Sequence, residues 1–275
     1  MRAVCDICPH HCGLKEGETG FCKARTNING SITCINYGKL TSLALDPIEK
    51  KPLNRFLPGS KILSAGSFGC NLRCPFCQNH CISMAGEEEI ESVFLSPEEL
   101  VEKALELVPR GNIGIAYTYN EPLVGYEYVA DCGRLAREKK LKNVLVTNGY
   151  ICPGPLTDLL PLIDAMNIDL KSFDMKFYKR IGGKLETVKQ TIRLAAASCH
   201  VEITFLVIPN ENDSADEIKA MSEWISWIDP DIPLHISRFF PMYRYDMRKP
   251  TPVSKVYELA EIAKKSLRYV YTGNC

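Results

Sequence analysis

The 275-residue sequence predicts an α/β fold built on a parallel sheet. Six short apolar or β-branched runs follow one another along the chain, and amphipathic stretches of helical period separate them. Such alternation is typical of parallel strands joined by right-handed helical crossovers. It is consistent with an open doubly wound sheet or with a barrel-like (β/α)6 arrangement. No G-x-G-x-x-G follows the first run, which disfavours a dinucleotide-binding fold.

The expected strands occupy residues 61–69, 113–119, 143–148, 165–170, 201–208 and 234–240. Three of the expected helices carry recognisable start signals. Ser96 is expected to cap one helix, and Glu99 completes its capping box. Ser214 and Glu217 repeat this pattern, and Thr251-Pro252 opens a third helix.

The start of the chain has a different character. Five of the thirteen cysteines lie within residues 1–34, interleaved with Gly, Pro, Asn and Thr, and no long amphipathic pattern occurs there. A small loop-rich segment usually needs a covalent or metal staple. Its end is marked by turn-forming residues, namely Pro47, Pro52, Pro58 and Gly59. We therefore expect a Cys-rich N-terminal metal-binding unit at residues 1–58 and the barrel at residues 59–275.

The charge balance and the apolar pattern limit the functional classes. The 33 basic and 33 acidic side chains give a formal net charge of zero, so no electrostatic argument favours nucleic acid or an anionic membrane. No apolar run is long enough for a signal peptide or a membrane span. We therefore expect a cytoplasmic protein without nucleic-acid or membrane partners. In that compartment, clustered cysteines of odd number point to metal binding rather than to disulfides.

Three closely spaced cysteines, Cys70, Cys74 and Cys77, follow the first expected strand in the segment GCNLRCPFC. Their position places them in a loop at the C-terminal end of that strand. Three thiolates at this spacing can hold three irons of a [4Fe–4S] cluster and leave the fourth iron open, as catalytic metal sites require. A zinc site that combines these thiols with His80 or Cys81 is the alternative.

The C-x3-C-x2-C spacing, with Phe76 directly before the last cysteine, resembles the signature of the radical S-adenosylmethionine (SAM) superfamily. The resemblance implies a partial (β/α)6 TIM-like barrel. It makes the three cysteines the catalytic cluster ligands and Phe76 a cofactor contact. It also implies that the open iron chelates SAM, and that one electron from the cluster cleaves SAM to methionine and a 5′-deoxyadenosyl radical. That radical abstracts a hydrogen atom from the substrate.

The same resemblance assigns SAM contacts at the end of the second expected strand. Tyr119, Asn120 and Glu121 stand where related enzymes carry a Gly-Gly-Glu segment that faces the SAM amino group. Glu121 keeps the acid, and the backbone at Tyr119 and Asn120 is expected to accept hydrogen bonds from the amino group. The alternative for Glu121 is a solvated loop carboxylate.

Two further segments, VTNG at the end of the third expected strand and NIDLK at the end of the fourth, look like those of activating enzymes for glycyl-radical proteins. They imply that Asn148 bonds the ribose hydroxyls and that Lys171 approaches the SAM carboxylate. They also imply that Asp169 helps to coordinate a monovalent cation, although Val146 replaces the usual acidic companion of that site. A buried salt bridge is the alternative for Asp169 and Lys171.

The last two expected strands supply contacts to adenine and to the substrate. Residues 207–210 are expected to pack against the adenine through apolar atoms and backbone groups. His235 and Arg238 are expected to face the substrate, where Arg238 would pair with an anionic group. A structural role is the alternative for both side chains.

A second set of cysteines lies near the N-terminus at C-x2-C-x3-C-x9-C spacing, formed by Cys5, Cys8, Cys12 and Cys22. Four thiolates complete either a tetrahedral zinc site or a [4Fe–4S] cube, with no open position, and the sequence does not decide between them. His10 or His11 could replace one thiolate. A reduced Cys-rich loop without metal is the alternative.

The other six cysteines have no assigned chemistry. Cys81 is expected to line the site, and Cys275 to be exposed. The rest are expected to be small core residues, and these are Cys34, Cys132, Cys152 and Cys199.

Segments outside the cysteine motifs narrow the resemblance. LDPIEKKPL at residues 45–53, SRFFP at residues 237–241 and YVYTGN at residues 269–274 resemble the AmmeMemoRadiSam-system radical SAM proteins, a branch related to pyruvate formate-lyase activating enzymes. The name of this branch implies Memo-like and AMMECR-like partner proteins. We also expect a reductant such as flavodoxin or ferredoxin and a protein or peptide substrate.

Three functional hypotheses follow. The first is a radical SAM enzyme that abstracts hydrogen from a protein or peptide. The second is an activase that installs a glycyl radical on a formate-lyase-type enzyme, although the ferredoxin-like insert of many activases is absent after Cys77. The third is a non-enzymatic iron–sulfur electron carrier or regulator.

Overall fold

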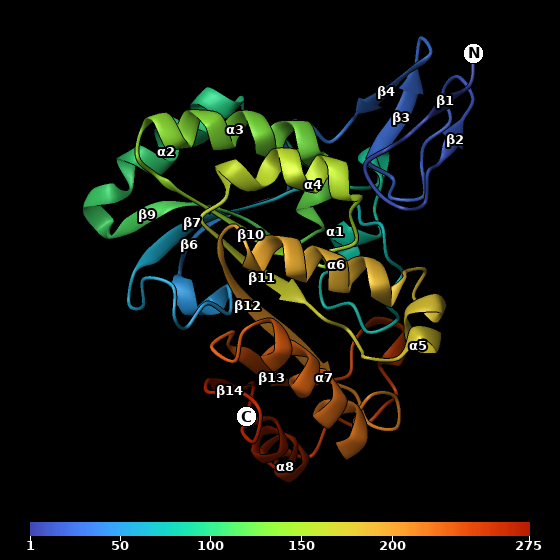
Figure 1. Ribbon diagram of the computed structural model, residues 1–275. Coiled ribbons are helices and arrows are strands. Elements are labelled where there is room, and N and C mark those ends of the chain that lie inside the picture. The colour runs from blue at the N-terminus through green and yellow to red at the C-terminus, as the bar shows by residue number, and fades with distance from the viewer.

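The computed structural model describes residues 1–275 (Figure 1). The strands of its large sheet are β6 (Ser42–Pro47), β7 (Lys61–Gly66), β9 (Asn112–Tyr117), β10 (Lys142–Thr147), β11 (Ala165–Asp169), β12 (His200–Val207), β13 (Leu234–Arg238) and β14 (Val270–Gly273). The helices are α1 (His80–Ser83), α2 (Pro97–Glu106), α3 (Tyr126–Glu138), α4 (Pro153–Leu159), α5 (Met175–Arg180), α6 (Leu185–Ala196), α7 (Ala215–Ile228) and α8 (Val253–Ala263). The short strands outside the sheet are β1 (Ala3–Val4), β2 (Gly13–Leu14), β3 (Arg25–Ile28), β4 (Ser31–Cys34), β5 (Lys39–Leu40) and β8 (Val93–Phe94).

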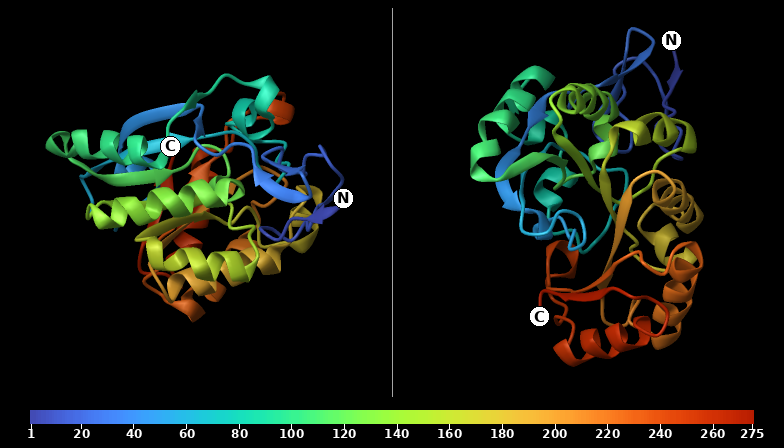
Figure 2. Two further views of the ribbon diagram at one scale, coloured as in Figure 1. Left: turned by 90° about the horizontal axis from the view of Figure 1, so that it is seen from above. Right: turned by 60° about the vertical axis from the view of Figure 1, so that its left-hand side comes forward.

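The large sheet confirms the predicted α/β fold. Its eight strands follow the order β14-β13-β12-β11-β10-β9-β7-β6. Strand β6 is antiparallel to β7, and every other neighbouring pair is parallel. The sheet curves, and helices cover its outer face (Figure 2). Its edge strands β6 and β14 do not pair with each other, so the sheet forms a partial barrel, as expected.

The six predicted strands are all present, and the sheet gains β6 and β14 at its two edges. Neither edge strand contains a fully buried residue, because each has only one neighbouring strand. They therefore lack the apolar pattern that marks a central strand. The proposed division at residue 58 stays a prediction; β6, which precedes that residue, belongs to the large sheet.

Alternation along each strand separates the two faces of the curved sheet. Outward-facing residues such as Leu63 and Ile115 join a core of 52 buried residues between the sheet and the helices. A smaller cluster lies inside the barrel, where Ile48 and Leu53 pack against inward-facing strand residues, namely Ile62, Ala116, Val144 and Ala165. The segment after β6 thus closes the N-terminal end of the barrel.

One buried carboxylate holds this closing segment in place. Glu202 of β12 accepts hydrogen bonds from the backbone N–H groups of Asn54 (2.9 Å) and Arg55 (2.7 Å). The Nε2 atoms of His200 and His235 lie 2.9 Å and 2.6 Å from the same carboxylate. Burial alone would raise the pKa of Glu202, but these hydrogen bonds lower it to about 2.

The predicted capping residues begin their helices. Ser96 caps α2, and Glu99 completes the capping box. Ser214 caps α7 by accepting a hydrogen bond from the N–H group of Glu217. The Glu217 carboxylate instead accepts a hydrogen bond from Ser172 Oγ (2.5 Å), so it ties α7 to the segment after β11 rather than completing a box.

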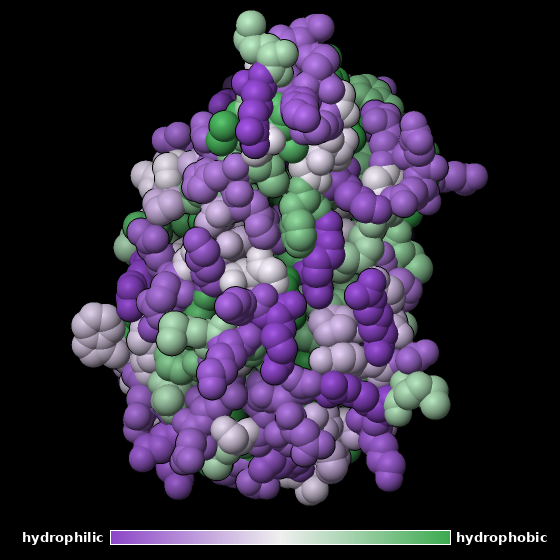
Figure 3. Space-filling view, turned by 90° about the vertical axis from the view of Figure 1, so that its right-hand side faces the viewer, coloured by the Kyte–Doolittle hydropathy of each residue, from purple (hydrophilic) through white to green (hydrophobic).

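The N-terminal hairpins β1–β2 and β3–β4 lie together at one end of the molecule (Figure 1). No helix of the structure is both long enough and apolar enough to cross a membrane. On the face shown in Figure 3, hydrophobic residues are scattered among hydrophilic ones and form no broad patch.

Candidate functional site

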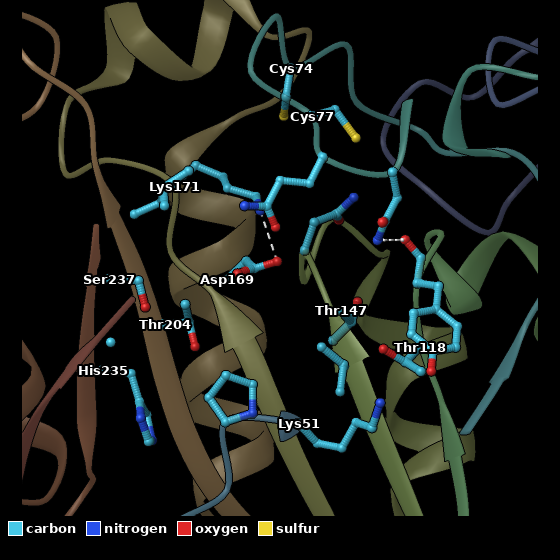
Figure 4. Close-up of a pocket in the computed structure, with 18 of the residues that line it drawn as sticks. Lys51, Cys74, Cys77, Thr118, Thr147, Asp169, Lys171, Thr204, His235 and Ser237 are labelled. Carbon is cyan, nitrogen blue, oxygen red and sulfur yellow. Dashed lines mark hydrogen bonds and ion pairs between the residues drawn. The ribbon is translucent and has the colours of Figure 1, made fainter. Parts of the chain in front are cut away.

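A cavity of about 660 Å³ occupies the inside of the barrel (Figure 4). Its size lies within the range of roughly 300–1,000 Å³ that is usual for ligand pockets. Cys74 and Cys77 lie at one end of the cavity, and Lys51 and His235 lie at the other. Side chains from the inner face of the sheet line the space between, so the fold leaves a polar chamber under the cysteine loop.

The cysteine loop leaves β7 at the C-terminal end of the strand, as predicted. Cys70, Cys74 and Cys77 all line the cavity. Gly69 has a φ of +87°, and a Cβ there would lie 2.6 Å from the carbonyl oxygen of Cys22. Only glycine therefore permits the turn that directs Cys70 into the chamber.

The three thiols are held in their neutral form when no metal is bound. Burial raises the pKa of Cys74 to about 12 and also raises the pKa values of Cys70 and Cys77. The Lys171 ammonium group opposes this rise at Cys74 and Cys77. Metal binding at these thiols must therefore displace protons, and a nearby positive charge favours the thiolate form.

The donor set fits a [4Fe–4S] cluster with one open iron. Three sulfur ligands from one short loop face the same cavity, and the remaining space adjoins them. The thiols must turn toward a common centre when they bind iron, since no group of three His, Cys, Asp or Glu side chains is prearranged around an ion. His80 and Cys81, the extra ligands of the zinc alternative, lie outside the cavity lining.

Glu121 is a buried carboxylate with several hydrogen-bond donors rather than a solvated one. It is 2% exposed. Its oxygens accept hydrogen bonds from Thr147 Oγ1 (2.7 Å), the Asn148 N–H (2.7 Å) and the Leu123 N–H (3.0 Å). Burial nevertheless raises its pKa to about 7. Glu121 thus joins the ends of β9 and β10 at the cavity wall, and its contact with the SAM amino group stays a prediction.

Tyr119 and Asn120 shape the rim of the cavity. Tyr119 has a φ of +73°, and its carbonyl oxygen accepts a hydrogen bond from Asn79 Nδ2 (2.7 Å). The side-chain amide of Asn120 donates to the carbonyl groups of Phe68 (3.0 Å) and Gly69 (3.1 Å). Asn120 therefore fixes the base of the cysteine loop. The SAM-amino contacts expected at the backbone of both residues stay predictions.

Asn148 turns its side chain toward the cysteine loop. Its Nδ2 donates to Asn71 Oδ1 (2.9 Å) and lies 3.6 Å from Cys70 Sγ. Its Oδ1 accepts a hydrogen bond from the Tyr150 N–H (2.8 Å). Asn148 lines the cavity, so it links the end of β10 to the cluster loop, and the ribose contact stays a prediction.

Asp169 and Lys171 form the expected alternative, a salt bridge at a strand end. Their charged groups lie 2.8 Å apart, and both side chains line the cavity. Burial opposes the charge of Lys171, but the Asp169 carboxylate raises its pKa. Figure 4 shows the pair below Cys74, between the cysteine loop and the barrel interior. The pair is therefore placed to meet an anionic group at the cluster, and the SAM contact stays a prediction.

Phe76 lies where a cofactor contact was expected. It is buried, it lines the cavity, and its ring packs beside those of Phe177 and Tyr245. The cofactor contact expected of Phe76 stays a prediction.

Strand alternation corrects the expectation for Arg238. Arg238 does not line the cavity; its Nε donates to the carbonyl oxygen of Thr251 (2.7 Å). Its neighbour Ser237 faces the cavity, as His235 does, because residues two apart share a face. Residues 207–210 lie outside the cavity lining, whereas Thr204 and Leu206 belong to it, and the adenine contact expected at residues 207–210 stays a prediction.

The sequence reasoning missed a charged pair at the far end of the cavity. Lys51 is 3% exposed, and its Nζ lies 2.8 Å from Asp46 Oδ2 and 4.7 Å from the centre of the Tyr119 ring. Tyr119 Oη donates to the same carboxylate oxygen (2.7 Å). Burial would raise the pKa of Asp46, but these partners lower it to about 2. The signal in the sequence was Asp46, an acidic residue five positions before Lys51.

The N-terminal cysteines are also brought together. Cys5, Cys8, Cys12 and Cys22 line one small cavity next to the cysteine loop. His10 lines it as well, but His10 Nε2 lies 2.9 Å from the carbonyl oxygen of Asn71, and the His11 side chain does not reach it. Burial raises the pKa values of Cys8 and Cys22. A metal at this site stays a prediction.

Among the remaining cysteines, Cys132 is fully buried and Cys275 is exposed, as expected. Cys81 is exposed and does not line the cavity, contrary to expectation, because α1 turns it to solvent. The three others are only partly buried, namely Cys34, Cys152 and Cys199.

Comparison with known proteins places these features in a family. The model of the "Radical SAM superfamily" matches residues 66–225. Uncharacterized protein MJ0808 of Methanocaldococcus jannaschii is 45% identical over 278 residues, which cover 99% of this chain and 81% of that protein.

More distant matches agree. The pyruvate formate-lyase-activating enzyme of Clostridium pasteurianum is 29% identical over 163 residues, covering 57% of this chain and 66% of that enzyme. The crystal structure of SuiB from Streptococcus suis matches with a TM-score of 0.60 at 13% identity, covering 76% of this chain and 48% of SuiB, and supports the fold. The chain belongs to the radical SAM superfamily, whose members use a [4Fe–4S] cluster and SAM, and it is related to the pyruvate formate-lyase-activating enzymes.

Proposed function

We propose that this radical SAM enzyme abstracts a hydrogen atom from a protein or peptide, whose loop or terminus enters the barrel between β6 and β14. The observation that carries this proposal is the open seam of the barrel. The two edge strands do not pair, and the cavity is lined both by residues 49–52 after β6 and by residues 271–274 of and after β14. A chain segment can therefore approach the cavity from the side.

The size of the cavity limits what enters. About 660 Å³ must hold SAM as well as the reacting part of the substrate. A folded protein cannot fit, so a protein substrate would present a short extended segment. The walls beyond the cysteine loop offer polar partners for its backbone, including Thr204, Ser237 and Tyr271.

Several residues that line the cavity have proposed roles that follow from their positions. Cys70, Cys74 and Cys77 would hold the cluster, which together with SAM supplies a 5′-deoxyadenosyl radical as the hydrogen-abstracting species. Lys171 would attract the SAM carboxylate, with Asp169 keeping the ammonium group oriented at 2.8 Å. Glu121 would position Asn148 at the cavity wall through the hydrogen bond to its N–H group. Phe76 would pack against the cluster side, where Phe177 and Tyr245 support its ring.

A flavodoxin or ferredoxin is the proposed electron donor, because SAM cleavage needs one low-potential electron per event. Within the superfamily, the motifs LDPIEKKPL, SRFFP and YVYTGN support the AmmeMemoRadiSam branch. We accordingly propose Memo-like and AMMECR-like proteins as partners.

The second candidate is an activase that installs a glycyl radical on a formate-lyase-type enzyme. The relationship to the activating enzyme of Clostridium pasteurianum favours it. SuiB, which shares the fold, has been crystallised with a precursor peptide, which supports a peptide substrate. The third hypothesis, a non-enzymatic electron carrier, has lost its support, since membership of the family makes the chain a radical SAM enzyme.

Deuterium transfer tests the substrate class. Cells grown in deuterated medium would be extracted, and the extract divided by ultrafiltration into a protein fraction and a small-molecule fraction. The reconstituted enzyme would be incubated with each fraction, SAM and reductant, and the 5′-deoxyadenosine analysed by mass spectrometry. The proposal expects deuterium from the protein fraction, and its loss after protease digestion to single amino acids.

Deuterium arriving only from the small-molecule fraction would overturn the proposal. A glycyl-radical signal in electron paramagnetic resonance, on a candidate lyase treated with the enzyme, would favour the activase instead. In both arms, Cys74→Ala provides the background without SAM cleavage.

A further inference from the structure

We infer that Cys5, Cys8, Cys12 and Cys22 bind one zinc ion, and that this ion holds the catalytic cysteine loop in position. The zinc site does not depend on the proposed substrate. Its effect on the loop rests on the catalytic role of Cys70, Cys74 and Cys77.

The local fold brings the four thiols to one place. Cys5 follows β1 and Cys12 precedes β2, and the Cys5 N–H donates to the carbonyl oxygen of Cys12 (3.1 Å) across the hairpin. Cys8 lies in the hairpin loop, and Cys22 comes from the turn before β3. All four line the same small cavity. Two short loops thus bring four thiols to the wall of one small cavity, where they could turn inward to complete a four-sulfur zinc site.

A buried arginine at this cavity lacks a partner that a metal–thiolate site would supply. Arg25 is 4% exposed and lines the cavity. Its terminal nitrogens bind the Glu127 carboxylate at 2.7 Å and 2.5 Å, but its Nε is buried with no hydrogen-bond partner. A zinc ion with four thiolates carries a net charge of −2, so its sulfur atoms would accept the orphan Nε–H.

The size of the cavity favours a single ion over a cluster. The cavity measures about 10 Å³, the space of about one water molecule. One zinc ion fits such a space once the thiols turn inward. A cube of four irons and four sulfides would force the walls apart.

The second half of the inference comes from contacts between the two cysteine sets. The carbonyl oxygen of Cys22 accepts a hydrogen bond from the Cys70 N–H (3.1 Å). Next to Cys22, the carbonyl oxygen of Phe21 accepts a hydrogen bond from Arg73 Nη2, and the Arg73 guanidinium lies 4.0 Å from the centre of the Phe21 ring.

The hairpin loop makes a separate contact with the same segment. His10, between Cys8 and Cys12, places its Nε2 2.9 Å from the carbonyl oxygen of Asn71. Three residues of the catalytic loop are therefore held by residues that are ligands of the N-terminal site or lie next to them. Zinc bound to the four thiols would keep these contacts in place. Loss of the zinc would weaken the contacts and loosen the ligands of the catalytic cluster.

The test measures metal on the full-length protein, purified without oxygen and reconstituted with iron and sulfide. Elemental analysis should give one zinc and about four irons per chain. Zinc X-ray absorption should show sulfur neighbours at about 2.3 Å. About eight irons without zinc would overturn the choice of zinc in favour of a second cluster. About four irons without zinc would overturn the site altogether.

Cys8→Ser and Cys22→Ser should lower the zinc content at least tenfold, whereas Cys34→Ser, in the same unit but outside the cavity lining, should keep it. The coupling is read from iron release to a chelator, which requires neither substrate nor turnover. Wild-type protein stripped of zinc should release iron several-fold faster than the zinc-loaded protein. Equal rates would overturn the coupling while leaving the zinc count as a separate result.

Discussion

The buried carboxylate of Glu202 offers the sharpest test of how the barrel is closed. It is fully buried, and it is the common acceptor for Asn54, Arg55, His200 and His235. Glu202→Gln keeps the shape of the side chain but removes the charge and turns an NH2 group toward donors. The segment at residues 48–60 should then lose part of its hold on the sheet.

The magnitude follows from the pKa of Glu202, which lies at about 2 instead of the ordinary 4.5. A difference of about 2.5 units corresponds to about 3 kcal/mol of unfolding free energy at neutral pH. The native state binds fewer protons than the unfolded state in this interval. This stabilisation is therefore complete above about pH 4.5 and is lost as the pH falls toward about 2.

Urea unfolding of wild type and variant, with equal metal content, measures the difference. Glu202→Gln should lower the free energy of unfolding by about 3 kcal/mol at neutral pH, and the gap should narrow below about pH 4.5. Glu223→Gln, which removes only an exposed charge 4.0 Å from Lys219, should cost less than about 1 kcal/mol. A gap near zero at neutral pH, or one that widens in acid, would refute the reasoning.

Two other substitutions test the site. Gly69→Ala places a Cβ 2.6 Å from the carbonyl oxygen of Cys22 and should lower both the free energy of unfolding and the iron content. Gly59→Ala, at a similar φ of +81° with no atom within 4 Å, should cost only about 1–2 kcal/mol. Equal losses of unfolding free energy in urea would contradict the close approach at Gly69. Asp46→Asn should destabilise the protein by about 3–5 kcal/mol because it leaves Lys51 charged and unpaired, and adding Lys51→Met should recover more than about 1 kcal/mol. Strict additivity of the two substitutions would show that the pair is not coupled.

Much of the structure could be predicted from residue patterns within short stretches of the sequence. The central strands, the caps of α2 and α7 and the cysteine loop all follow from patterns within a few residues. The cavity confirms that Cys70, Cys74 and Cys77 face one chamber. Local rules suffice there because each element is decided by its own hydrophobic period or by one turn.

The wrong or missing predictions concern side chains whose position or partner depends on segments distant in the sequence. Arg238 was expected in the cavity, but the register of β13 turns Ser237 inward and Arg238 outward. Lys51 was missed because its partners, Asp46 and Tyr119, meet it only after the segment at residues 48–60 folds under the barrel. Glu217 does not complete the predicted capping box, because its carboxylate accepts a hydrogen bond from Ser172 in the segment after β11.

The central claim is that the three cysteines of the loop after β7 hold a cluster that cleaves SAM. The most direct measurement uses the protein purified without oxygen, reconstituted with iron and sulfide, and mixed with SAM and a strong reductant. We predict formation of 5′-deoxyadenosine, its absence in Cys74→Ala, and its retention in Cys199→Ala, which lies outside the cavity. A fully loaded cluster that forms no 5′-deoxyadenosine, or an active Cys74→Ala variant, would contradict the account.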